Sequence, residues 1–302
     1  MKTSRLIPSV ILFMAASAGA ALAQQKVKLG ENAALRYWSA FAQMQDSAIT
    51  DEQAKELNLI LDGTAPYSDL KYRDLVEKNR PALETMIRGT VLPNCDWGMD
   101  YQHGSETPID FVRKALTLGR LNILYALHLL QTGDKDGAVR ALAAGFRFSH
   151  DVANGGTLFA SLVTKHLLAD HLRVITFALH MGEVSAAQRL VLRQAVAQLG
   201  PDGLDWKSNV KRELEILRDA PNILRDDPNF PHGLDPEAKA ALARIVPAYV
   251  GVLDKPSTLP ELQQLIASAP KPLQGIIPNP KKVVEQRQDL TDKLLQTRTL
   301  LQ

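Results

Sequence analysis

Cysteine is almost absent from this chain, in which Cys95 is the only one among 302 residues. A single thiol excludes an internal disulfide, a four-cysteine zinc site and paired-thiol redox chemistry. An unpaired cysteine packs as a small hydrophobic residue, so we expect Cys95 to be buried and inert. A reactive thiol, or a disulfide with another chain, stays open as an alternative.

A net charge is also lacking, because 35 lysines and arginines stand against 33 aspartates and glutamates. The first 23 residues hold two of the bases and no acid, so the rest of the chain has 33 charges of each sign. A balanced chain has no global field that attracts polyanions, which argues against a nucleic-acid partner. The chain also lacks a phosphate-binding glycine loop, an HExxH, a CxxCH and a GxSxG motif, and we expect no cofactor.

The N-terminal 23 residues have the pattern of a secretory signal. Lys2 and Arg5 precede an apolar run from Leu6 to Ala21, and Ala21-Leu22-Ala23 offers small residues before a cut. This pattern predicts cleavage at about Ala23 and export to the periplasm or the extracellular medium. We expect no transmembrane segment once the signal is removed, because the apolar run is too short to be a span.

The remaining segments have helical spacing of apolar residues, and none has the β-branched alternation of strands. Helices are expected over residues 32–44, 51–62, 69–89, 109–130, 135–152, 158–180, 185–199, 204–219, 236–253, 259–269 and 281–301. Pro81 predicts a kink, or two shorter helices, within 69–89. Short glycine-containing turns predict antiparallel neighbours. The fold class expected is therefore all-α, an irregular stack of antiparallel helix hairpins.

One turn resembles a tetratricopeptide hairpin. Ala126, Gly133, Ala138, Leu142 and Gly145 follow the order of small and large positions in that repeat. The next comparable turn lies 49 residues further on at Gly182, whereas the repeat has a period of about 34 residues. We therefore expect tetratricopeptide-like packing without a regular array.

Proline divides the chain into two parts. Twelve of the 17 prolines fall between Pro201 and Pro280. We interpret residues 24–200 as a core of helical hairpins and 201–302 as a proline-punctuated helical C-terminal region. The connectors 221–236 and 270–280 are expected to be extended.

The segment Leu92-Pro93-Asn94-Cys95-Asp96-Trp97-Gly98 carries a family resemblance. With the long helix and the Gly133 turn that follow, it resembles a group of uncharacterised exported helical proteins of bacteria that share an LPxCDWG loop. The likeness covers roughly residues 70–200. It implies the fold and the compartment, and it implies no activity.

The loop 91–107 concentrates residue types that carry chemistry. Cys95, Asp96, Trp97, Tyr101 and His103 all lie within it. A thiol beside a histidine suggests a nucleophile with its base, and the mixture of Cys, His and acid also suggests a metal site. The simpler interpretation is a long loop held by burial of Trp97 and Tyr101, with Asp96 capping nearby backbone. A third hypothesis is that this loop forms a pocket for a small ligand.

Two further sets of residues are candidates for ligand binding. Arg113 and Arg120 are seven residues apart, as are Arg140 and Arg147, so each pair lines one helix face. They predict either an anion-binding groove, for a phosphate, a carboxylate or a cell-wall polymer, or internal ion pairs with the acidic N-terminal helices.

His166 and Asp170 lie four residues apart and can share a metal ion, with His128 or His150 as a third ligand. The alternative for this pair is a surface hydrogen bond between the imidazole and the carboxylate. The structural positions of the neighbouring histidines decide which is feasible.

These observations predict an exported, non-catalytic scaffold or interaction module that docks another exported or envelope protein. The alternative is a protein that binds a small anion or a metal ion, or a hydrolase, working from the 91–107 loop and the arginines.

Overall fold

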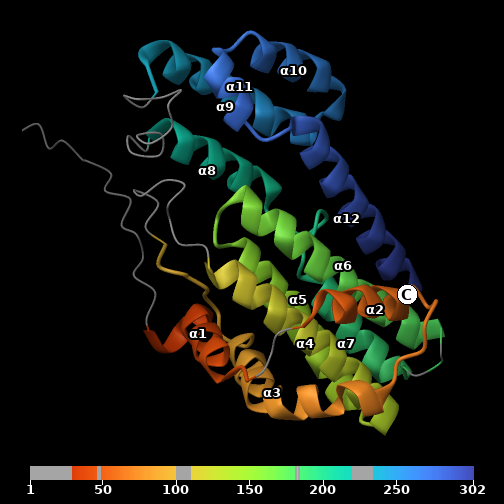
Figure 1. Cartoon of the computed structure of the whole chain (residues 1–302). Coiled ribbons are helices and arrows are strands. Elements are labelled where there is room, and N and C mark those ends of the chain that lie inside the picture. Colours follow the sequence, from red (N-terminus) through yellow and green to blue (C-terminus); the bar gives the residue numbers. More distant parts are fainter. Residues whose placement is uncertain (1–28, 46–48, 100–109, 181, 183, 220–233) are drawn as a thin grey trace, which may run out of the picture.

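The computed structural model describes residues 29–45, 49–99, 110–180, 182, 184–219 and 234–302 (Figure 1). The predicted signal, Tyr101, His103 and most of the connector 221–236 lie outside these residues. The described residues form helices joined by short turns, and their β-type pairing is one isolated bridge between Asn32 and Asn94. The all-α prediction is confirmed. Among these helices none is long and apolar enough to cross a membrane.

The helices follow the expected ranges closely. They are α1 Ala33–Gln43, α2 Asp51–Leu61, α3 Asp69–Gly89, α4 Asp110–Thr132, α5 Lys135–Ala153, α6 Leu158–His180, α7 Ala186–Ala197, α8 Trp206–Asp219, α9 Pro236–Asp254, α10 Leu259–Ala267, α11 Lys271–Ile276 and α12 Pro280–Leu300. Thr50 and Ser185 form capping boxes with Gln53 and Gln188. Local capping chemistry therefore sets these two helix starts.

One expectation about proline is narrowed and another needs correction. The segment 69–89 is one helix with Pro81 inside it, so the alternative of two shorter helices is wrong, and the kink stays a prediction. The connector 270–280 contains the short helix α11 and is not wholly extended. Pro272 stands in the first turn of α11, where a missing N–H leaves no hydrogen bond unmade, so proline is compatible with a helix there.

The core is built on α4, α5 and α6, which are successive helices joined by short turns (Figure 1). Gly133 has φ +87° between α4 and α5, a conformation that favours glycine. Between α5 and α6 the turn includes Gly156, also at φ +87°. Helix α6 is buried from several sides, since α2, α4, α5, α8 and α12 all contact it. Tetratricopeptide-like packing of these hairpins stays a prediction.

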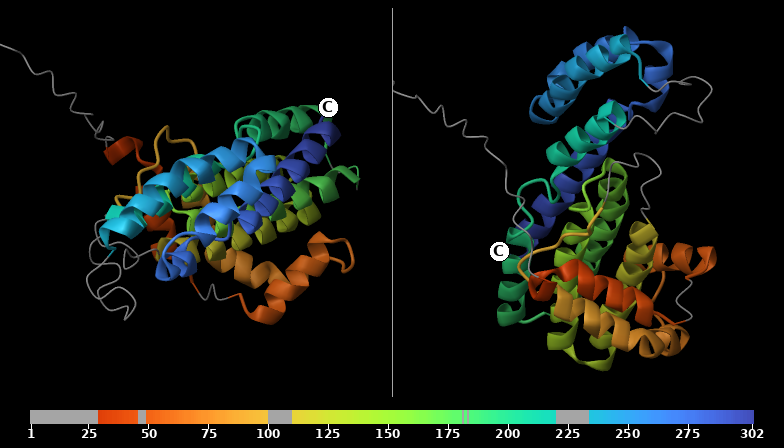
Figure 2. Two further views of the ribbon diagram at one scale, coloured as in Figure 1. Left: turned by 90° about the horizontal axis from the view of Figure 1, so that it is seen from above. Right: turned by 90° about the vertical axis from the view of Figure 1, so that its left-hand side faces the viewer.

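The C-terminal helices return to this core. Helix α8 packs on α6 and on α9, and α9, α10 and α11 gather at one end of the molecule (Figures 1 and 2). Helix α12 then runs back along α6 to reach α7. The end of the chain thereby lies beside helices that precede it by more than 100 residues.

A fully buried histidine lies inside the hairpin core. The Nδ1 atom of His171 is 2.8 Å from the Leu167 carbonyl oxygen, which only accepts, so Nδ1 carries the proton. The Nε2 atom then accepts from Asn122 Nδ2 at 3.0 Å. Burial lowers the pKa of His171 to about 4. The ring is therefore neutral in the folded protein at neutral pH.

Acid should destabilise the fold through His171. The unfolded histidine titrates near its ordinary pKa of 6.5, so below that pH the unfolded state binds the extra proton and the folded state does not. The stabilisation is complete above pH 6.5 and is lost as the pH falls towards 4. From pH 7 to pH 5 the free energy of unfolding should fall by about 2 kcal/mol more than in His171→Gln. Urea denaturation at both pH values measures the difference, and equal falls in the two proteins would contradict it.

Candidate functional site

The first candidate, the segment around Cys95, is tied to the N-terminal helix by its backbone. Asn32 caps α1 through its side-chain oxygen, which accepts from Ala34 N at 3.1 Å and from Asp96 N at 2.9 Å. Its amide nitrogen donates to the Asp96 carbonyl at 2.8 Å. Ala33 N donates to the Asn94 carbonyl at 2.7 Å. One asparagine therefore both begins a helix and holds the loop to it.

The same loop is held to α5 at Asp151, whose side chain is only 1% exposed. Tyr37 Oη donates to this carboxylate at 2.6 Å, and Arg147 Nε lies 2.9 Å from its other oxygen as a charge contact. Trp97 Nε1 donates to the Asp151 carbonyl at 2.7 Å, and its ring stacks on Tyr37 and Phe111. This network is a structural clasp that buries Trp97.

Cys95 lies in this clasp as a half-buried thiol, so the expectation of a buried side chain is met only in part. Its Sγ lies 3.8 Å from the Asp151 carbonyl oxygen. Burial, followed by the Asp151 charge, raises the pKa of Cys95 far above its ordinary value. The thiolate is the nucleophilic form, so this environment disfavours the nucleophile hypothesis. Asp96 accepts from Gly98 N at 2.9 Å and so caps the turn.

A pocket of about 380 Å³ lies beside the clasp, and it is lined by Cys95, Asp96, Trp97, Met99, Asn154, Gly155 and Arg212. Its wall includes the three described loop residues that the sequence singled out. The other two predicted loop residues, Tyr101 and His103, lie outside the described residues.

The predicted arginines do not share one groove. Arg147 is engaged by Asp151 and lies 3.5 and 3.4 Å from the carbonyl oxygens of Leu92 and Pro93, so it supports the clasp. Arg113 is exposed on the first half of α4. Arg120, two turns further along the same helix, lines a different pocket near α6 and α12.

That second pocket brings together residues from two separate sequence hypotheses. Arg120, His166 and Asp170 all line a polar pocket of about 420 Å³ between α2, α4, α6 and α12. The complete lining, named here the polar pocket, is Asn58, Asp62, Arg120, Lys165, His166, Ala169, Asp170, Arg173 and Lys293. Four cationic side chains therefore surround the pair that was predicted to bind a metal.

Ion pairs organise most of these charges. Arg173 pairs with Asp62 and, at 3.1 Å, with Asp170. Lys165 pairs with Asp289, and Lys293 donates to both oxygens of Asp289 at 2.7 and 2.8 Å. Arg120 has no hydrogen bond and no ion pair to its side chain within the part of the chain that the structure describes. Its charge acts on Asp170 and opposes the rise in the pKa of that carboxyl.

The pocket also shifts the ionisation of its own residues. Burial lowers the pKa of His166, and the charge of Lys165 adds to this effect. Burial raises the pKa of Asp170, and Arg173 and Arg120 oppose that change. Burial also acts to raise the pKa of Asp289, but hydrogen bonds from Lys165 and Lys293 outweigh it and lower the pKa. His166 is accordingly a neutral hydrogen-bonding group at pH 7.

A metal ion in this pocket would meet surrounding positive charge. Among the described residues no group of three or more His, Cys, Asp or Glu side chains is placed to hold a metal. His128 bonds with Asp69, and His150 lies beside Asn154, so both proposed third ligands are engaged elsewhere. The metal hypothesis for His166 and Asp170 stays a prediction, and the neighbouring lysines and arginines disfavour it.

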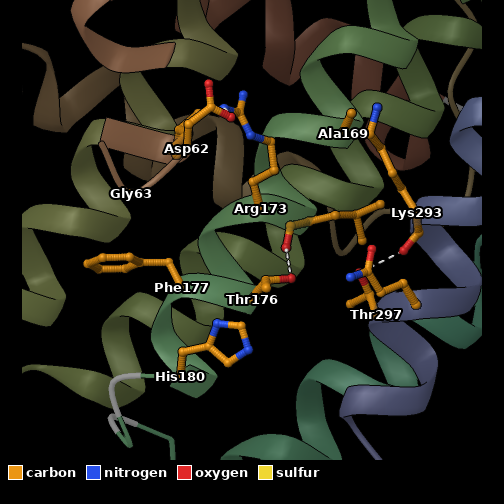
Figure 3. A pocket seen from close by; sticks show the side chains of 12 residues that line it. Asp62, Gly63, Ala169, Arg173, Thr176, Phe177, His180, Lys293 and Thr297 are labelled. Atoms are coloured by element: carbon orange, nitrogen blue, oxygen red, sulfur yellow. Dashed lines mark hydrogen bonds and ion pairs between the residues drawn. The ribbon is translucent and has the colours of Figure 1, made fainter. Parts of the chain in front are cut away.

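The polar pocket continues into a less polar one. The middle pocket, of about 380 Å³, shares Asp62, Ala169, Arg173 and Lys293 with the polar pocket. Figure 3 shows Phe177 and His180 on α6 and Lys293 and Thr297 on α12 around this space. A third, apolar pocket of about 550 Å³ shares Gly63 and Phe177 with the middle one. The apolar pocket is lined by Gly63, Thr64, Ala65, Pro66, Tyr67, Leu127, Leu130, Gln131 and Phe177.

Sequence reasoning missed several residues that line the polar, middle and apolar pockets. Arg173 follows Asp170 by three residues, so helical spacing alone could have added it to the His166 and Asp170 face. Lys293 comes from α12, more than 100 residues away, and no local pattern links it to α6. Phe177 has the spacing of a core residue, so the sequence does not mark it as a pocket residue.

Neither a protein-family model nor a curated protein or solved structure matches this chain.

The environment of Cys95 makes a prediction about its reactivity. At pH 8 the native protein should react with a disulfide reagent at least about tenfold more slowly than the urea-unfolded chain, because the raised pKa of Cys95 in the folded protein disfavours the thiolate. The rate is followed by release of the coloured thiol product. A native rate that equals the unfolded rate would show that Cys95 is accessible and ionisable.

Proposed function

We propose that this protein is an exported binding protein that holds a small anion in the polar pocket. The observation that carries the proposal is Arg120, a cation that lines the pocket and has no hydrogen-bond or ion-pair partner in the described part of the chain. A guanidinium offers paired N–H donors in a planar fork that fits a carboxylate or a phosphate. Export itself rests on the signal-like pattern of residues 1–23.

The surroundings of Arg120 support binding over catalysis. Asp62 and Asp170 are both engaged by Arg173, so the carboxylates that line the pocket are already paired. His166 is kept neutral by burial and by Lys165 and so adds a hydrogen-bonding group without a charge. The one cysteine, Cys95, is a half-buried thiol with a raised pKa, and it lines a different pocket. These features favour recognition of a charge that the ligand itself brings.

A scaffold role is a second proposal, and it rests on exposed apolar side chains. Leu190 and Val191 on α7 are 44% and 43% exposed, and Leu295 on the adjoining α12 is 63% exposed. Such residues suit contact with another exported or envelope protein. Photocrosslinking from position 190 or 295 in the native host tests it. One specific protein adduct would support the role, and the lack of any adduct would contradict it.

Replacement of Arg120 tests anion binding. A bound anion stabilises the folded protein, by about 1.4 kcal/mol when its concentration is ten times Kd. We expect acetate, compared with chloride at the same ionic strength, to raise Tm of the wild-type protein by a few degrees. Arg120→Gln should abolish this increase.

The matched control is Arg113→Gln, an exposed arginine on the same helix outside the polar pocket. Arg113→Gln should keep the full acetate response. If the two variants respond alike, Arg120 does not bind the anion and the proposal fails.

A further inference from the structure

The polar, middle and apolar pockets form one groove along α6. Four shared residues join the first two pockets, and Gly63 and Phe177 join the second to the third. His166 at the polar end and Phe177 at the junction with the apolar pocket are eleven residues apart. At 1.5 Å per residue, the helix between them spans about 16 Å. A ligand that follows the groove is therefore long and changes in polarity along its length.

The charge at the polar end fits a head group with a single negative charge. Arg120, Lys165, Arg173 and Lys293 bring four positive charges, and these are met by the carboxylates of Asp62, Asp170 and Asp289. Four against three leaves one positive charge. A carboxylate neutralises this excess, whereas a phosphate dianion would exceed it.

The middle of the groove suits a chain without hydrogen-bonding groups. The Thr176 hydroxyl donates to the Leu172 carbonyl at 3.2 Å, and the Thr297 hydroxyl donates to the Lys293 carbonyl at 2.9 Å. Both protons are therefore already used inside the protein. Leu61, Ala169, Leu172 and Phe177 supply an apolar wall along this stretch, and the exposed His180 and Gln296 supply polar groups. A hydrocarbon chain lies on the apolar wall without leaving a polar group of its own unpaired.

We infer that the groove binds a single-chain fatty carboxylate. Its head group lies at Arg120 in the polar pocket, and its chain passes Ala169 and Phe177. The chain ends in the apolar pocket, beside Tyr67, Leu127 and Leu130. This inference rests on the proposed anion site and adds the chemistry of the ligand to it. Burial of the chain supplies affinity that a bare anion lacks, at about 0.8 kcal/mol for each CH₂ group removed from water.

Titration calorimetry with three probes tests the inference, each used below its micelle-forming concentration. Acetate presents the head group alone, dodecanoate presents the head group with the chain, and dodecyltrimethylammonium presents the same chain with a positive head. We expect dodecanoate to bind at least about 100-fold more tightly than acetate. It should also bind at least about tenfold more tightly than dodecyltrimethylammonium, because the latter meets the excess positive charge.

Two phenylalanines on α6 provide a matched pair of variants. Phe177→Gln removes an apolar wall that two pockets share, and it should weaken dodecanoate binding about tenfold or more while leaving acetate binding unchanged. Phe159→Gln alters a half-exposed phenylalanine on the same helix outside the groove, and dodecanoate binding should not change. Circular dichroism of both variants establishes that each is folded.

The outcomes separate the two proposals. If dodecanoate binds no more tightly than acetate, or if the Phe177 and Phe159 variants behave alike, the fatty-carboxylate inference is overturned while the anion site stands. If neither anion binds, or if Arg120→Gln leaves both affinities unchanged, the anion site itself is wrong. Equal affinity for dodecanoate and dodecyltrimethylammonium would indicate that the head group contributes nothing, and it would also overturn the inference.

Discussion

The buried amine of Lys165 is the constraint on which the groove depends. Lys165 is only 4% exposed, although it lies on the largely apolar helix α6. A charged amine in such a place requires a partner, since an unpaired buried charge costs several kcal/mol. The partner is Asp289 on α12, assisted by Gln286 at 2.8 Å. The pair of Lys165 and Asp289 therefore ties α12 to α6.

The position of α12 then creates the space between the helices. Lys293, one turn after Asp289, donates to the same carboxylate and forms part of both the polar and the middle pocket. Across from it, α2 is held to α6 by the Asp62 and Arg173 pair. Side chains of these ion pairs therefore line the groove. Arg120 of α4 adds a positive charge that the carboxylates of these pairs do not neutralise. The proposed anion site and the ion pairs that hold these helices together therefore share residues.

The Asp151 clasp, between α1, α5 and the Cys95 loop, follows the same physical principle. The buried carboxylate of Asp151 contacts Tyr37 and Arg147. The backbone carbonyl of Asp151 accepts a hydrogen bond from Trp97 Nε1. The loop that carries most of the chemically suggestive residues is therefore explained, within its described part, by burial and hydrogen bonding. Its concentration of Cys, Asp and Trp in the sequence reflects the needs of a loop that must be held without secondary structure of its own.

Local signals in the sequence were sufficient for the helices and insufficient for the site. Apolar spacing predicted α2, α5 and α7 closely, because such contacts lie within one or two helical turns. Arg120 and His166 were recognised as candidates, but the sequence assigned them to different sites. Their meeting in one pocket depends on how α4 and α6 pack. Lys293 was out of reach of any local pattern, because it faces α6 only after α9, α10 and α11 have reversed the chain. Arg147 shares a seven-residue spacing with a surface arginine, and only tertiary structure reveals its pairing with Asp151.

The central claim is that α2, α6 and α12 enclose a groove that receives an anionic head group at Arg120. A crystal structure of the mature protein grown with dodecanoate tests it most directly. The account predicts continuous ligand density in the groove, with the carboxylate at hydrogen-bond distance from the Arg120 guanidinium and the chain passing Phe177. An empty groove, or a chain with its carboxylate at the opposite end beside Tyr67 and Leu127, would contradict it.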